Sequence, residues 1–262
     1  MTIKSKVLAA AATLTLVSGI GAAGALTAGT ASAATPSCGT LCVDVFSWQF
    51  GNFHHPNFTL DVFRGGAKVG QPIILFRTSN SDGAEDFSAE FNGTTSSFYA
   101  AGMVSAQVAL HYGCSGTIAV NGAQIPCAPG SADTAAFEIE YAPFGANSGL
   151  CIGVGTARLA ATGTAQVSLQ PCGQDSRTVW IVDTNDQTRI TAAGVPLING
   201  SDTNFSHPSV LTYPANGYPT DKPRPQLTVK NLTGFTQPGG IFPVLGSINS
   251  NQLWSADLGV LP

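Results

Sequence analysis

The stretch Gly149–Asp183, GLCIGVGTARLAATGTAQVSLQPCGQDSRTVWIVD, holds the clearest strand pattern in the chain. Leu150–Val154 and Gln166–Gln170 are short apolar alternations, and a third one, Thr178–Val182, follows a polar turn. Short alternating segments between turns rich in Gly, Ser and Thr are typical of β-strands. The stretch therefore predicts a unit of three strands, with which the rest of the chain can be compared.

Weaker copies of this unit lie on both sides of it. In the reference unit Cys151 opens the first strand and Cys172 closes the second, whereas the first copy, 57–91, has Thr59 and Thr78 at these places. The last copy is expanded, and its expected strands are Val195–Ile198, Ser209–Tyr213 and Gln252–Trp254. A loop with four prolines, Tyr213–Pro225, is expected inside it.

The segment between the first copy and the reference unit has a less regular pattern. Phe98–Tyr112 carries two short strand signals, and Asn121-Gly122 predicts a tight hairpin between Cys114 and Cys127. Ala136–Pro143 alternates and predicts a strand. The segment is either a shrunken copy, with Phe137 in the place of Trp180, or an insertion, which we favour. No part of the chain after the first 33 residues has helical periodicity.

The first 33 residues predict a cleaved secretory signal peptide. Lys4 and Lys6 form a positive start, Val7–Ala28 is uncharged and apolar, and Ala31-Ser32-Ala33 is a typical cleavage site. We therefore expect a secreted, extracellular protein, 34–262, forming a single domain with no membrane contact after cleavage.

The net charge of the chain bears on which partners it can bind. Without Lys4 and Lys6, nine of the 11 Lys and Arg remain against 15 Asp and Glu, so the mature net charge is −6. An acidic chain without a basic patch is a poor partner for nucleic acid or anionic membranes. Neither a partner protein nor an oligomeric state is indicated.

Six cysteines in an exported chain predict disulfides rather than a metal site. Proximity in the sequence favours the pairs Cys38–Cys42, Cys114–Cys127 and Cys151–Cys172 among the 15 possible pairings. A zinc site is disfavoured because no Cys-x-x-Cys motif occurs, and His54-His55 is expected to form a polar turn. We expect no metal and no cofactor.

Three triplets that end in an aromatic residue complete the pattern: Glu85-x-Phe87, Thr178-x-Trp180 and Gln252-x-Trp254. With Leu60-Asp61-Val62 and Cys151–Val154 before them, they resemble the Q-x-W repeats of the ricin-type β-trefoil family of carbohydrate-binding modules. The chain also resembles a group of exported actinobacterial proteins. The family resemblance implies an all-β, β-trefoil-like fold with an insertion around 92–147, core positions for both tryptophans, and a disulfide within the central repeat.

The resemblance also implies where sugar would bind. In this family an Asp in the first strand accepts sugar hydroxyls, an aromatic residue ending the second stacks on the sugar, and an Asn precedes Q-x-W. The first copy has Asp61 and Phe76, with Ala84 in place of the Asn. The central copy has Gly153 and Gln170, which leave no site. The last copy keeps Asn251 and has Asp202 and Tyr213 nearby.

Three functions are compatible with the sequence. The first is a secreted, non-catalytic carbohydrate-binding protein using Asp61, Phe76 and Asn251, with glycans or polysaccharide as partners. The second is a secreted structural or protein-interaction scaffold without sugar binding. The third is an extracellular polysaccharide hydrolase using Glu138 and Glu140, whose spacing places both on one face of a strand. We expect no enzyme, because a polar strand face explains this pair equally well.

Overall fold

The computed structural model describes residues 44–50, 58–79, 82–88, 92–129, 131–155, 165–182, 194–203, 208–233 and 248–257. All of these belong to one folded unit, Thr35–Pro262. The expected signal peptide, the pair Cys38–Cys42 and the histidines at 54 and 55 lie outside the described residues. No helix in the described ranges is long and apolar enough to cross a bilayer.

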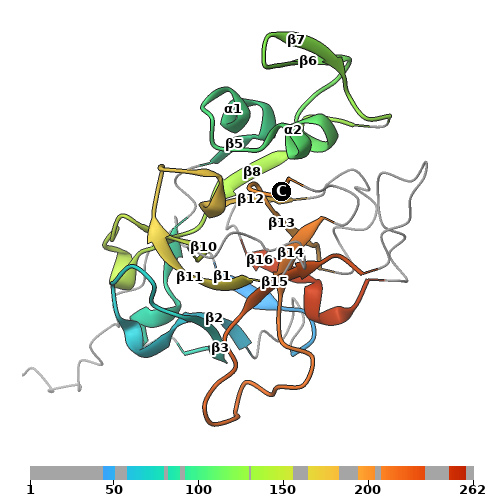
Figure 1. Cartoon of the computed structure of the whole chain (residues 1–262). Coiled ribbons are helices and arrows are strands. Elements are labelled where there is room, and N and C mark those ends of the chain that lie inside the picture. Colours follow the sequence, from blue (N-terminus) through green and yellow to red (C-terminus); the bar gives the residue numbers. More distant parts are fainter. Residues whose placement is uncertain are drawn as a thin grey trace, which may run out of the picture. The chain divides into compact units, whose positions relative to one another are not determined.

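The described residues form mostly short strands with two short helices (Figure 1). The strands are β1 (Asp44–Ser47), β2 (Phe58–Val62), β3 (Ile73–Arg77), β4 (Phe87–Ser88), β5 (Asn92–Thr94), β6 (Thr117–Val120), β7 (Ala123–Pro126), β8 (Ala135–Glu138), β9 (Glu140–Tyr141), β10 (Leu150–Val154), β11 (Ala165–Pro171), β12 (Val179–Val182), β13 (Leu197–Asn199), β14 (Ser209–Thr212), β15 (Thr228–Asn231) and β16 (Trp254–Asp257). The helices are α1 (Thr95–Ala100) and α2 (Ala106–Tyr112).

Twelve strands fall into three sets of four with the same pairing. The sets are β1–β4, β9–β12 and β13–β16, and in each the second strand pairs antiparallel with the first and the third. The fourth strand of each set pairs with the first strand of the next, giving β4–β9, β12–β13 and β16–β1. This threefold ring of four-stranded repeats is a β-trefoil, as the sequence predicted.

The third strands of the repeats meet one another around the threefold axis. The backbone N–H of Val167 in β11 donates to Leu227 O before β15 (2.9 Å), and Leu227 N–H donates to Ile73 O in β3 (2.8 Å). Leu169 N–H donates in turn to Gln71 O just before β3 (2.9 Å). Backbone hydrogen bonds therefore join all three repeats at the axis as well as around the ring.

The aromatic residues of the three triplets are buried in one shared core, as predicted. The indole N–H of Trp180 donates to Ile152 O, and that of Trp254 donates to Leu211 O, each at 2.9 Å. Strand registers place these two carbonyls at the same point of β10 and β14. Each tryptophan therefore joins the fourth strand of its repeat to the second through its side chain. The side chain of Phe87 has no N–H and cannot form this hydrogen bond.

The disulfide of the central repeat has a different replacement in each of the other two. Cys151–Cys172 is formed, and so is Cys114–Cys127 in the insertion. Register places Thr59 and Thr78 at the equivalent positions of the first repeat, as predicted, and Val210 and Leu232 at those of the third. Val210 and Leu232 are both buried in one apolar cluster. In the third repeat, apolar packing therefore occupies the place of the disulfide of the central repeat.

Our alignment of the last copy was wrong by one strand. β14 and β15, rather than Val195–Ile198 and β14, form the hairpin equivalent to β10 and β11. We missed β15 because the long loop with four prolines separates it from β14. Leu197–Asn199 is the first strand of the repeat and pairs with β12.

The strand signals in 98–112 were also wrong, since two short helices lie there. A capping box joins Thr94 and Ser97 at the start of α1, and the Ser105 side chain accepts from Val108 N–H at the start of α2. Val108 and Tyr112 of α2 pack against β12, β13 and β14 in a second apolar cluster. The ribbon β6–β7 extends beyond the two helices (Figure 1).

Replacing either tryptophan tests the link within its repeat. We expect Trp180→Phe and Trp254→Phe each to lower the free energy of unfolding by about 1–3 kcal/mol, because a buried carbonyl loses its donor. Urea unfolding measures the change. Equal stability of either variant and the wild type would contradict the proposed role of the indole.

Candidate functional site

The outer face of the β2–β3 hairpin carries the predicted pair. Asp61 lies opposite Ile74, and Phe76 lies opposite Thr59, so Asp61 and Phe76 are diagonal neighbours on one face. Leu60 and the other alternate residues point to the opposite face and enter the core. The structure thus brings together the two residues that the family resemblance singled out in the first repeat.

This face is covered by the third repeat. The guanidinium of Arg224 lies 4.2 Å from the ring centroid of Phe76, as a cation–π contact. Next to it, Gln226 forms a β-bridge with Ile74. Asp61 is only 3% exposed. A sugar therefore cannot reach Asp61 or the face of Phe76 under Arg224 unless the loop that ends at Pro225 moves.

Burial makes Asp61 an unusual carboxyl. The pKa of Asp61 is raised to about 7, chiefly by burial and also by the carboxylate of Asp82. The guanidinium of Arg224 lowers this pKa and partly offsets the two effects. The group is thus partly protonated at neutral pH. A protonated carboxyl is a weaker acceptor for sugar hydroxyls than a carboxylate.

A second group of acidic and aromatic side chains borders this face. Asp82 caps the short 3-10 helix η3 (Gly83–Glu85), accepting from Ala84 N–H at 3.0 Å. The pKa of Tyr141 is raised to about 12, chiefly by burial and in smaller part by the nearby charges of Asp61, Asp82 and Asp86. The Tyr141 hydroxyl donates to Gly65 O (3.2 Å). The carboxyl groups of Asp61, Asp82 and Asp86 therefore lie near Tyr141, where the first and central repeats contact each other beside the β2–β3 hairpin.

In the described residues of the other two repeats, no such group of acidic and aromatic side chains lies at the equivalent positions. In the central repeat, Gly153 and Gln170 occupy the positions of Asp61 and Phe76. A Cβ on Gly153 would come within 2.9 Å of the Thr178 side chain, so no larger residue fits there without rearrangement. Gln170 donates to Ser168 Oγ (2.8 Å) and is buried. Strand register therefore confirms the positions predicted for Gly153 and Gln170 in the central repeat.

The third repeat places Thr212 and Lys230 at the clamp positions. The suggestion that Tyr213 stacks on a sugar was wrong, because its ring is buried in the core. Asp202 is buried as well and accepts from Ser209 N–H at 2.6 Å. Asn251 is half-buried, and its amide donates to Tyr213 O (2.7 Å). The clamp residues expected in this repeat therefore do not converge.

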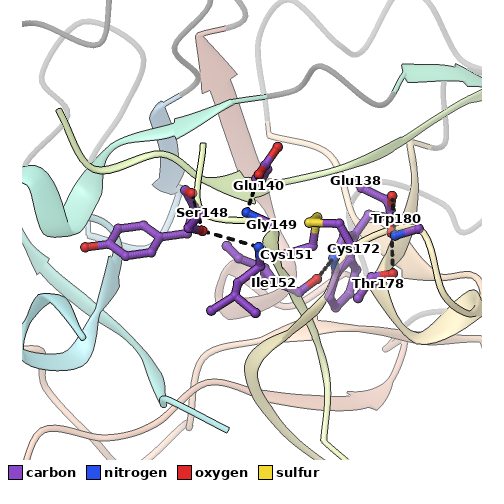
Figure 2. Close-up of a disulfide and its surroundings, with 12 residues drawn as sticks. Glu138, Glu140, Ser148, Gly149, Cys151, Ile152, Cys172, Thr178 and Trp180 are labelled. Atoms are coloured by element: carbon purple, nitrogen blue, oxygen red, sulfur yellow. Dashed lines mark hydrogen bonds between the residues drawn. A yellow bond between two sulfur atoms is a disulfide. The ribbon is translucent and has the colours of Figure 1, made fainter. Parts of the chain in front are cut away.

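Glu138 and Glu140, the pair considered for hydrolysis, each bind a backbone N–H group. Both are buried, Glu138 in β8 and Glu140 in β9, and they lie on either side of the Cys151–Cys172 bridge in Figure 2. Glu140 Oε1 accepts from Gly149 N–H (2.6 Å), and Glu138 Oε1 accepts from Gly173 N–H (3.0 Å). Each carboxylate therefore binds a backbone N–H at the open end of the β10–β11 hairpin.

Glu138 completes a contact that recurs in every repeat. Register places Ser79, Gly173 and Thr233 at the same point, two residues beyond the third strand. A side chain accepts from the backbone N–H of each: Glu85 for Ser79 (2.7 Å), Glu138 for Gly173 (3.0 Å) and Gln252 for Thr233 (2.8 Å). Glu85 and Gln252 are the first residues of their triplets, whereas the central repeat has Thr178 there.

Thr178 is too short to make this contact itself. Its hydroxyl donates instead to Glu138 (Figure 2). Glu138 in turn reaches Gly173 from β8. We missed this role for Glu138, although the departure from Q-x-W at Thr178 is visible in the sequence. Within the described residues no three His, Cys, Asp or Glu side chains are grouped as metal ligands.

Comparisons with known proteins show only distant likeness. No family model and no curated protein matches the chain. ThreeFoil, a designed protein with threefold symmetry, matches with a TM-score of 0.43 and 12% identity over 82% of this chain and 96% of its own. A mosquitocidal holotoxin matches with a TM-score of 0.43 and 9% identity over 82% of this chain, which spans 17% of the toxin. The strand pairing, rather than these likenesses, establishes the β-trefoil.

Replacement of Glu138 tests the importance of its hydrogen bond with the Gly173 N–H. We expect Glu138→Ala to lower the free energy of unfolding by about 1–3 kcal/mol, because the Gly173 N–H loses its acceptor and the Thr178 hydroxyl keeps only its bond to Asp175 O. Adding Thr178→Gln should recover part of the loss, since Gln252 serves the same N–H in the third repeat. Urea unfolding compares the single and double variants. Full stability of Glu138→Ala would refute the structural role.

The raised pKa of Asp61 predicts a pH-dependent effect of Asp61→Asn. Because the folded protein holds this proton up to about pH 7, and the unfolded chain loses it near pH 4, the contribution of Asp61 to stability falls as pH rises between these values. Asp61→Asn should exceed the wild type by about 2–4 kcal/mol at pH 8 and by much less at pH 4 in urea unfolding.

Asp175→Asn serves as the control for this experiment. The hydrogen bond from Arg177 lowers the pKa of Asp175, so its stabilising contribution is present above about pH 4 and is lost as pH falls. The two variants should therefore differ from the wild type in opposite directions at pH 8. The same change for both would contradict the assignment of the shift to Asp61.

Proposed function

We propose that this protein is a secreted, non-catalytic carbohydrate-binding β-trefoil whose binding surface lies over the first repeat. The observation that supports it most is the exposed carboxylate of Asp82, which lies with Asp61 and Asp86 beside the β2–β3 hairpin in this repeat alone among the described residues. Asp61 itself is buried and the ring of Phe76 is covered by Arg224, so the accessible groups lie at the edge of this face. Carboxylates that accept sugar hydroxyls beside a ring that meets sugar C–H groups are the chemistry of such a site.

The contacts of Glu138 and Glu140 support the proposal that the protein is not an enzyme. Hydrolysis of a glycosidic bond needs one carboxyl as acid and another as base or nucleophile, with the bond between them. Here each carboxylate is buried and bound to a backbone N–H. Neither can approach a polysaccharide without opening the β10–β11 hairpin.

The disulfides support the proposed compartment. Cys114–Cys127 and Cys151–Cys172 are typical of proteins from oxidising environments. A secreted protein would keep both bonds. We propose secretion on this basis together with the expected signal peptide at 1–33.

A protein-interaction scaffold is the second candidate function. The covering of Asp61 and Phe76 by the third repeat favours the scaffold. Arg224 and Gln226 occupy the face where the ricin-type family would bind sugar. In this case the trefoil would serve to hold surface segments in place, such as the loop before Pro225 or the ribbon β6–β7.

Asp82→Ala separates the two candidates, and Asp175→Ala is its matched control. Both aspartates cap the 3-10 helix before their triplet, Asp82 in the first repeat and Asp175 in the second, so both variants lose a capping hydrogen bond, and Asp175→Ala loses the ion pair with Arg177 in addition. We expect retention on a glycan array and on cellulose and chitin particles to fall at least tenfold for Asp82→Ala alone, as one hydrogen bond to a charged group is worth about 1.5–3 kcal/mol.

The two other outcomes are equally clear. Equal losses in both variants would mean that the cap, not the carboxylate, matters for binding. No retention of the wild type at millimolar sensitivity, about −4 kcal/mol of binding free energy, would refute sugar binding and favour the scaffold.

A further inference from the structure

Phe144 is an exposed aromatic residue at the edge of the first-repeat site. It lies in the 3-10 turn η4 (Pro143–Gly145), between β9 and β10, and 53% of it is exposed. Among the described residues, Val69, Ile125 and Tyr218 are the other exposed large apolar side chains. Of these four, Phe144 is the one that contacts the acidic loop of the first repeat.

The backbone of Phe144 is in a strained conformation. Its φ of 54° and ψ of 32° lie in the left-handed region, which Gly and Asn adopt readily and which is unfavourable for a bulky side chain. Gly145 follows with a φ of 79°. A phenylalanine at this place lowers stability relative to Asn or Gly, and strain of this kind is concentrated at functional sites.

Asp86 holds this turn in place. Its carboxylate accepts from Phe144 N–H (2.8 Å), and its backbone oxygen accepts from Ala142 N–H (2.9 Å). Gly145 N–H donates to Ala142 O (2.9 Å) and closes the turn. The ring of Phe144 is therefore positioned by the loop that contains Asp82 and Asp86, rather than by its own strand.

The ring of Phe144 lies directly against Gly83. A Cβ at position 83 would come within 2.8 Å of Phe144 Cε2, so the contact depends on a glycine there. Asp82, the residue before Gly83, is exposed. The ring is thus supported by the backbone at Gly83, Phe144 as a whole is 53% exposed, and the exposed carboxylate of Asp82 belongs to the residue next to this support.

We propose that Phe144 is the stacking ring of the first-repeat site, receiving the apolar face of a pyranose sugar whose hydroxyls hydrogen-bond to Asp82. This inference rests on the proposed carbohydrate binding and places it at a definite position. Arg224 lies on Phe76, the ring that the family pattern would use, whereas Phe144 is an exposed residue and no cation lies over its ring within the described part of the chain. C–H groups on the face of a pyranose meet an open aromatic face favourably.

A purely structural role accounts poorly for the same features. A ring retained for packing would be buried, and a turn retained for its shape would have Asn or Gly at a left-handed position. Phe144 is exposed and left-handed at once. The combination is expected where a ring is displayed at some cost in stability.

Three variants of the full mature chain test the proposal: Phe144→Asn, Phe144→Tyr and Phe76→Leu. The probes are a glycan array of neutral pyranose oligosaccharides and particles of cellulose and chitin. We expect Phe144→Asn to reduce retention at least tenfold, Phe144→Tyr to keep it, and Phe76→Leu to change it less than threefold. The midpoint of thermal unfolding of Phe144→Asn should rise by about 2–4 °C, because the left-handed strain is relieved.

Each contrary result has its own meaning. Retention of the wild type together with undiminished retention of Phe144→Asn would overturn the stacking role and leave carbohydrate binding in place. A loss with Phe76→Leu instead would assign stacking to Phe76. A lowered unfolding midpoint of Phe144→Asn would show that the ring serves packing, and would overturn the proposal. Failure of the wild type to bind any glycan would end both the proposed function and the stacking role.

Discussion

The pairing of each repeat's fourth strand with the first strand of the next is the constraint on which the structure depends. It closes through β16 and β1, so every repeat is held by both neighbours. The insertion between β4 and β9 is compatible with this closure because it adds its own apolar cluster on the outside of β12, β13 and β14. The ring therefore tolerates a large addition in one connection while its three core aromatic residues stay in place.

Alternation in the sequence predicted the short strands, and the resemblance of the triplets ending in Phe87, Trp180 and Trp254 to the ricin-type repeats implied the ring. Prediction failed where the signal was not periodic. The helices α1 and α2 have six and seven residues, which is too short for a helical repeat to be visible, and only their capping residues mark them. The strand β15 was missed because a long loop separates it from the partner that defines its register.

The candidate site, too, could be predicted from the sequence in part only. Strand register determines the diagonal placement of Asp61 and Phe76, so the sequence could predict it. The positions of Arg224 on Phe76 and of Phe144 on Gly83 could not be predicted, because each contact joins segments of different repeats. No local pattern indicates such contacts. The residues that decide whether the site is open were therefore the ones that only the structure could identify.

The turn N–H beyond each third strand has a consequence for protein design. In the third repeat Gln252 binds it from within the repeat, whereas the central repeat depends on Glu138, which precedes its first strand. A symmetric trefoil assembled from three copies of the third repeat would carry its own partner for this group in each copy. One assembled from three copies of 140–182 would leave the N–H of Gly173 without this side-chain partner in each copy, unless each copy were extended to include β8.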